Sequence, residues 1–417
     1  MSTPPPTHSP PPFAALRNRD FAWFFVGNML SMMADNIEHV ITYWVIYDLF
    51  RSETLQGFAV ISHWLPFLLL SWYFGALADR FDCRRIMQWS QVLFMSVSLT
   101  WAILLLTDRL ETWHSIVLLI LHGLAGAIWN PARQLMIYDV VGADTLQSGI
   151  RLLATGRQLG ILFGPTVGGG IMLLLRPTLA LCVNALIYLP LIIWCHLVHY
   201  TGHGSGQQGK RGSWAEALSA LWGASHNRIL LAMILLPGFY AFFVGNAFQA
   251  QMPGFALALG TDEMGYGYVA LLTANGAGAV TGGLLLESLR VLRARASTAI
   301  LLAILWCCAM TAFAATAHYA FALLFLFLAG LLNLAFLSMT QTLVQLEAPV
   351  NLRGRLIGLY NMSAQGLRSF SGITVGFFGA VVGIHWSLGL STLVVLAIAI
   401  ALLLFTIKGA RPPEPVS

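Results

Sequence analysis

Charged residues are scarce in this chain: Asp, Glu, Lys and Arg make up 9% of its 417 residues, while 58% are hydrophobic. A typical soluble domain has about 25% charged residues. So few charges exclude a water-soluble globule of this length. The composition therefore predicts a protein embedded in a lipid bilayer.

Cysteine is also rare, and no pair has the Cys-x-x-Cys spacing of a metal or redox site. The five are Cys83, Cys182, Cys195, Cys307 and Cys308, which we interpret as packing residues. A partial phosphate-loop pattern starts at Gly204, but Arg211 stands where Ser or Thr would bind magnesium. No cofactor and no metal are expected.

Long apolar runs recur twelve times along the chain. They cover residues 21–49, 57–78, 86–107, 114–139, 147–175, 178–199, 229–256, 264–287, 298–316, 318–347, 356–383 and 385–407. Each run is long enough to cross a hydrocarbon core of about 30 Å as a helix. The alternating segments of a membrane β-barrel are not seen in the sequence. We predict an all-α, polytopic membrane protein with twelve transmembrane helices.

The positions of the basic residues predict the orientation of the chain. With the N-terminus in the cytoplasm, the loop arginines and lysines gather on the cytoplasmic side, and Arg51, Arg109 and Arg176 fall opposite. Both termini are then cytoplasmic. The net charge of +5 reflects this topology, so no nucleic-acid partner is expected.

Polar and glycine-rich stretches divide the chain into regions. We predict a disordered cytoplasmic tail (1–20), an N-terminal six-helix bundle (21–199), a cytoplasmic linker (200–228), a C-terminal six-helix bundle (229–408) and a second tail (409–417). The halves look related, because Gly283-Leu-Leu-Leu-Glu287 repeats Gly75-Ala-Leu-Ala-Asp79 at an offset of 208. Such repeats indicate two pseudo-symmetric bundles with a cavity between them.

A charged hinge lies between two apolar runs and contains Gly75, Asp79, Arg80, Arg84 and Arg85. Small residues allow helices to approach closely, and Asp79 can cap a helix or pair with Arg80 or Arg84. The alternative is an ordinary basic cytoplasmic loop. The spacing resembles the signature loop of the major facilitator superfamily, which implies that fold and a conformational latch at these five residues.

A glycine-rich helix face follows at Gly160, Gly164, Pro165, Gly168 and Gly169. Glycines at i, i+4 and i+8 permit backbone contact, and the proline bends the helix. General glycine packing is the alternative explanation. The string resembles the GxxxGPxxGG motif of drug:proton antiporters, which implies an exporter.

Further strings extend the resemblance over nearly the whole chain. They are Gly27-Asn28 with Asp35, Asn130-Pro131-Ala132-Arg133-Gln134, and Leu352-Arg-Gly-Arg355 with Asn361. They are similar to the branch that contains macrolide-efflux and enterobactin-exporter proteins. Because that branch exports antibiotics and siderophores, the resemblance leaves the substrate open.

Ionisable residues inside a membrane are costly unless they face a cavity or a partner. Asp35, Glu38 and His39 share one helix face and are the candidates for proton coupling. Asp35 is preferred, with pairing to Arg133 or Arg157 as the structural alternative; Glu38 could lie near the lipid interface instead. A metal site from Asp35, His39 and His63 is conceivable but less favoured.

The usual antiporter arginine is missing from the fourth run. In drug:proton antiporters this arginine is separated by three residues from a Gln-Gly pair. Here Leu118 stands at the arginine position, and His122 and Gly123 stand at the Gln-Gly pair. This departure places the usual proton-coupling arrangement in doubt.

The candidates for the substrate cavity are three arginines and three amides in apolar runs. They are Arg133, Arg157, Gln341, Gln345, Asn361 and Arg368. A buried guanidinium attracts an anionic or catecholate substrate, and amides hydrogen-bond varied ligands. A structural tether to helix carbonyls or to Asp139 is the alternative for the arginines.

Together these features predict a secondary active transporter in the bacterial inner membrane, and not an enzyme. We expect proton-coupled efflux of a small amphipathic molecule, such as a drug, macrolide or siderophore, by alternating access. The alternative is an uptake symporter or lysophospholipid flippase on the same scaffold. The expected partners are the substrate, protons and the lipid bilayer, and the chain is expected to be a monomer.

Overall fold

The computed structural model describes residues 13–202, 227–261, 265–289, 295–349 and 353–407. Within these ranges the regular structure is entirely helical, with no strand. The N-terminal half contains η1 (Ala14–Arg17), α1 (Arg19–Phe50), α2 (Glu53–Ala78), α3 (Cys83–Leu106), α4 (Thr112–Ile187) and α5 (Leu189–Leu197).

The C-terminal half has shorter pieces as well as long helices. They are α7 (Arg228–Phe243), α8 (Ala247–Ala250), α9 (Met252–Ala258), α10 (Tyr266–Leu289), α11 (Ala296–Ala315), α12 (Tyr319–Glu347), α13 (Arg353–Asn361), η2 (Met362–Gly366), α14 (Arg368–Ser371), η3 (Gly372–Phe377), α15 (Phe378–Val382) and α16 (Ile384–Ile407).

The long α4 is three rods joined end to end. Its backbone leaves the helical conformation at Gly142 (φ 69°) and at Arg176 (φ 62°). Glycine adopts positive φ at little cost, and Pro177 disfavours helical geometry in the residue before it. These two breaks separate the fourth, fifth and sixth predicted segments.

Two other predicted segments are interrupted. The 229–256 run is divided into α7, α8 and α9, with Gly245 at φ 44° between the first two. The 356–383 run contains two π-helical turns, η2 and η3. Seven helical stretches among the described residues are long and apolar enough to cross a membrane.

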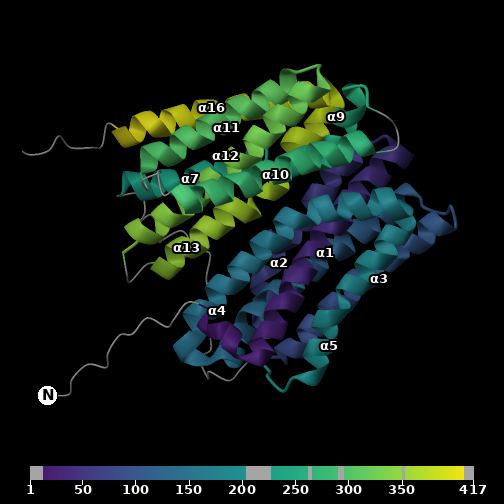
Figure 1. Cartoon of the computed structure of the whole chain (residues 1–417), viewed down its shortest axis with the longest axis vertical. Coiled ribbons are helices and arrows are strands. Elements are labelled where there is room, and N and C mark those ends of the chain that lie inside the picture. The colour runs from purple at the N-terminus through teal and green to yellow at the C-terminus, as the bar shows by residue number, and fades with distance from the viewer. Residues whose placement is uncertain (1–12, 203–226, 262–264, 290–294, 350–352, 408–417) are drawn as a thin grey trace, which may run out of the picture.

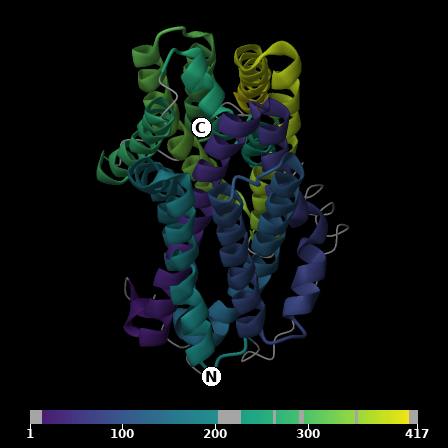
Figure 2. The ribbon, with the colours of Figure 1, turned by 90° about the vertical axis from the view of Figure 1, so that its right-hand side faces the viewer.

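The two halves form separate groups of helices that meet along one side (Figures 1 and 2). Near the α1–α2 turn, the Gln251 side chain donates to the Glu53 carbonyl at 3.1 Å. Deeper in the interface, the Tyr268 hydroxyl donates to the Val40 carbonyl at 3.0 Å. The α8 to α10 region is therefore held against α1 and α2.

The ends of the predicted regions lie only partly within the described residues. Residues 1–12, most of the linker (203–226) and the last tail (408–417) lie outside them, as does the phosphate-loop-like string. Residues 14–17 form η1 and α1 begins at Arg19, so helical structure starts before the predicted end of the first tail.

Candidate functional site

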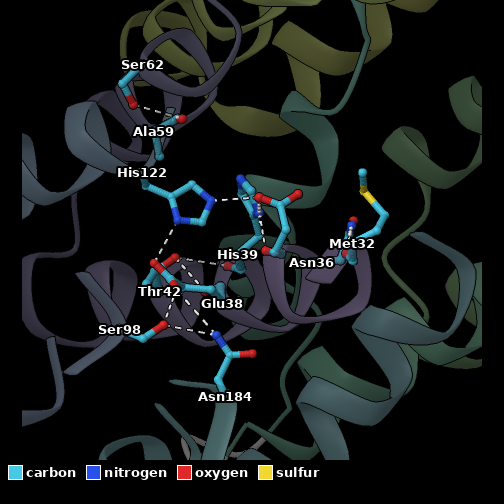
Figure 3. Close-up of polar contacts among 11 residues, drawn as sticks. Met32, Asn36, Glu38, His39, Thr42, Ala59, Ser62, Ser98, His122 and Asn184 are labelled. Carbon is cyan, nitrogen blue, oxygen red and sulfur yellow. Dashed lines mark hydrogen bonds and ion pairs between the residues drawn. The ribbon is translucent and has the colours of Figure 1, made fainter. Parts of the chain in front are cut away.

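A buried polar network lies in the N-terminal half, between α1 and α4. Asp35 and Glu38 of α1 flank the imidazole of His122 from α4. Figure 3 shows Glu38 beside the His122 ring. His122 Nε2 lies 2.8 Å from Asp35 Oδ1, and His122 Nδ1 lies 2.8 Å from Glu38 Oε1. When both ring nitrogens are protonated, the ring donates one hydrogen bond to each carboxylate.

Glu38 is held by two further side chains. The Ser98 hydroxyl of α3 donates to Glu38 Oε2, and Asn184 Nδ2 of α4 lies 3.3 Å from the same oxygen. Asn184 also donates to Ser98 Oγ at 3.0 Å. The Glu38 residue is only 2% exposed, so its side chain lies inside the helix bundle.

His39 and His63 complete a cluster with Asp35 and His122. The His39 ring centroid lies 4.5 Å from that of His63, on α2, and 4.9 Å from that of His122. The backbone carbonyl of Asp35 lies 2.6 Å from His39 Nδ1. The predicted shared face of Asp35, Glu38 and His39 is therefore present, and α2 and α4 add imidazoles to it.

The sequence pattern does not identify His122 as a site residue, and marks it only as a departure from the antiporter motif. A histidine followed by glycine in an otherwise apolar run is the one available signal. Gly123 allows α4 to approach α2 closely beside His122, because a Cβ atom at this position would clash with the Ser62 carbonyl of α2.

Within the described part of the chain, neither Arg133 nor Arg157 forms a salt bridge with Asp35, although Asp35 acts electrostatically on Arg157. Arg133 donates to Asn130 Oδ1 at 2.9 Å and lies over the Trp129 ring at 5.3 Å. Asp139 accepts instead from the backbone amides of Thr201 and Gly202, at 2.9 and 2.8 Å.

The three predicted arginines nevertheless lie near one another. Arg157 is close enough to interact electrostatically with both Arg133 and Arg368. Arg368 donates to Asn246 Oδ1 at 2.7 Å and lies 5.2 Å over the ring of Trp64, across the two halves. This group brings positive charge to the interface between the bundles.

The three predicted amide candidates do not join that group through any hydrogen bond found in the described part of the chain. Gln341 and Gln345 are exposed on α12, and Asn361 is exposed at the end of α13.

At the turn where the latch is predicted, the hydrogen bonds are made by Asp82 rather than by Asp79. Asp82 caps α3 by accepting from the Arg84 backbone amide at 2.9 Å, and it accepts from Arg84 Nη2 at 2.8 Å. Arg84 also donates to the Val198 carbonyl after α5. Asp79 forms no side-chain hydrogen bond within the described ranges, and a Cβ atom at Gly75 would meet nothing within 4 Å. Arg80 and Arg85 are exposed.

Replacing Asp82 with asparagine keeps a side chain that can cap the helix but removes the ion pair with Arg84, so it is expected to lower stability by about 0.5–1 kcal/mol. Burial alone would raise the pKa of Asp82, but its bonds with Arg84 outweigh burial and lower the pKa. Because the folded-state pKa is depressed, the stabilisation is present at neutral pH and is lost as pH falls through that pKa. Thermal unfolding of purified Asp82→Asn from pH 7 downwards checks this.

Asp79→Asn is the matched control, because it changes a carboxylate that has no such bond. Its melting temperature should equal that of the wild type, while transport slows if Asp79 acts in another conformation. An equal loss of stability in both variants would contradict the role given to Asp82.

Three glycines of the predicted face pack directly on α1, whereas a Cβ atom at the fourth, Gly169, would meet Val269 of α10. A Cβ atom at Gly164 would lie 2.5 Å from Asn36 Cβ, and one at Gly168 would lie 2.9 Å from Ile37 Cα. A Cβ atom at Gly160 would lie 2.9 Å from Met33 N. These contacts lie one or two residues from Asp35, so the glycines fix the helix that carries the polar network.

Comparisons with known proteins show the family of the chain. The family model described as "transmembrane secretion effector" matches residues 10–412. A staphyloferrin A transporter from Staphylococcus aureus (strain NCTC 8325 / PS 47) is 21% identical over 182 residues, which are 43% of this chain and 45% of that protein. The chain thus spans about half the length of this curated relative.

Solved structures show the same fold at low identity. An inward-facing, unoccupied bacterial homologue of the human lysosomal transporter Spinster superposes with a TM-score of 0.72 at 14% identity, covering 95% of this chain and 99% of that one. The nucleoside transporter NupG gives a TM-score of 0.69 at 12% identity, with 94% of this chain and 100% of that one covered.

The predicted all-α, polytopic fold is confirmed, and both the family and the fold are those of membrane transporters rather than enzymes. The family model matches nearly the whole length of the chain. The protein belongs to the transmembrane secretion effector family of major facilitator transporters.

Proposed function

We propose that this transporter is a proton-coupled exporter of a small amphipathic molecule, in the drug:proton antiporter branch. The observation that carries the proposal is the buried Asp35–His122–Glu38 network, with two 2.8 Å contacts from one imidazole. An isolated buried charge is costly, so proton uptake or release by this network requires the neighbouring helices to move and rebalance the charge. That requirement couples the proton to the arrangement of α1 and α4.

The proposed substrate carries negative charge. Arg133, Arg157 and Arg368 lie near one another, and no salt bridge to any of the three occurs in the described residues. An anionic group, as in a siderophore, supplies the charge that such arginines lack. Arg368 lies at the interface of the halves, where alternating access exposes a substrate to each side in turn.

The proposed direction is outward across a bacterial inner membrane, with both termini cytoplasmic. The family description supports secretion. Residues 21–199 and 229–408 are the proposed moving bundles of a monomer, with the charged turn between α2 and α3 as the cytoplasmic latch.

A lipid flippase is the second candidate, and one feature favours it. An apolar hollow of about 770 Å³ opens between α4, α10 and α12. Its lining includes Leu173, Val269, Leu323 and Phe327. A hollow of this size accommodates an acyl chain.

Everted membrane vesicles with an imposed proton gradient test the proposal. A panel of macrolides, cationic dyes and siderophores is offered, and gradient-dependent uptake of anionic members is expected. Accumulation only in right-side-out vesicles would indicate uptake, and movement of a labelled lysophospholipid alone would indicate the flippase. No gradient-dependent uptake of any compound by folded protein would overturn the proposal.

A further inference from the structure

We infer that Asp35, His39, His63 and His122 form a binding site for one first-row transition-metal dication, with Zn²⁺ as the best-fitting ion. This inference goes beyond transport and does not depend on it. It rests on the position of four ligand-type side chains from α1, α2 and α4, three separate helices.

The first support is the spacing of the ligand atoms. One ligand atom from each of the four residues lies within 4.8 Å of the others. Zinc takes four ligands in a tetrahedron, with bonds of about 2.0–2.2 Å to nitrogen or oxygen. Adjacent ligands are then a little over 3 Å apart, so modest side-chain rotations bring this set onto one ion. Imidazoles and a carboxylate also match the donor preference of zinc.

The second support is the set of outer hydrogen bonds. Metal-binding histidines usually donate their other ring N–H to a carbonyl or carboxylate. His39 Nδ1 lies 2.6 Å from the Asp35 carbonyl, and His122 Nδ1 lies 2.8 Å from Glu38 Oε1. Both contacts leave Nε2 as the ligand atom and fix the direction of the ring.

The third support is a small cavity with an unused imidazole nitrogen beside it. The cavity measures about 10 Å³, close to the space for one water molecule, and His39, His63, His122 and Glu38 line it. His63 is 7% exposed, and its Nδ1 has no hydrogen-bond partner in the described residues. A buried polar atom of this kind is costly unless something binds it.

The charge balance also favours a dication. Asp35 and Glu38 place two carboxylates at the site. Arg157 and Arg368 act electrostatically on Asp35 and His63 respectively and oppose a cation. The charge of Arg368 is partly balanced by other groups, because its guanidinium donates to Asn246 and lies over the face of Trp64. Bound through His122 Nε2, the ion would take the place of any proton on that nitrogen, while Nδ1 keeps its contact with Glu38.

Cobalt titration of the purified, detergent-solubilised full chain, with its affinity tag removed, tests the site. Tetrahedral Co²⁺ absorbs strongly in the visible range, whereas hydrated Co²⁺ does not. We expect saturation at one equivalent, displacement by Zn²⁺, and an affinity at least about tenfold lower in His63→Gln. His385→Gln is the matched control, because His385 lies in the other half and bonds the Ala314 carbonyl.

His63→Cys keeps a ligand and guards against misfolding as an explanation. It should retain the visible band and add a thiolate-to-cobalt charge-transfer band. Absence of a saturable band in folded wild-type protein, or equal affinity in wild type and His63→Gln, would overturn the inference. Gradient-driven uptake in metal-free vesicles is measured separately, so failure of the metal site leaves the transport proposal standing.

Discussion

Replacing Asp35 with asparagine is expected to reduce proton-gradient-driven uptake into everted vesicles by at least about tenfold, while substrate binding is retained. Asparagine has the shape of the carboxylic acid but cannot exchange a proton. It also leaves His122 with Glu38 as its one charged partner in the network. Binding is measured by equilibrium dialysis and uptake by initial rates, both on the same preparations.

Two further variants make this result interpretable. Asp48→Asn changes an exposed carboxylate near the end of the same helix, 3.6 Å from Arg51, and should transport normally. Asp35→Glu keeps an exchangeable proton and should retain part of the activity. Removing one partner from a buried pair costs about 3–5 kcal/mol, so gel filtration must show that Asp35→Asn is folded. Full gradient-driven uptake by folded Asp35→Asn would refute proton coupling at this residue.

Replacing Gly164 with leucine is expected to give the largest structural effect of any single change in the glycine face. Even a Cβ atom there would lie 2.5 Å from Asn36 Cβ and 3.1 Å from the Met33 carbonyl oxygen. Overpacking costs about 1–3 kcal/mol when side chains can adjust, and here backbone must move as well. We expect a lower melting temperature and at least about tenfold slower transport.

Gly170→Leu provides the matched control, since it makes the same change six residues further along the helix. A Cβ atom at Gly170 meets nothing within 4 Å. This variant should fold and transport as the wild type does. If Gly164→Leu and Gly170→Leu behave alike, the close contact between α4 and α1 does not limit transport.

The two predictions concern one structural unit. The glycine face of α4 approaches α1 between Met29 and Ile37, and Asp35 lies within that stretch. His122 lies on the first rod of α4, and the glycines lie on the second, after the break at Gly142. Movement of the second rod along α1 would therefore shift the Asp35 carboxylate relative to His122. The glycine motif and the polar network are linked by packing, although the sequence presents them as separate features.

The membrane character, the helical fold and the shared face of Asp35, Glu38 and His39 could all be predicted from the sequence. These follow from local properties, because apolar run length sets a membrane span and helical periodicity places i, i+3 and i+4 together. The breaks at Gly142 and Arg176 were also signalled by weak points between apolar runs.

The partners of these residues, in contrast, depend on how the helices pack. His122 is 87 positions from Asp35, and Asn184 is 146 positions from Glu38, so no local pattern pairs them. The choice of Asp82 over Asp79 at the α2–α3 turn likewise depends on where α3 begins. Pairing across helices is set by how their faces meet, and that packing depends on small residues such as Gly123 and Gly164 meeting specific backbone atoms.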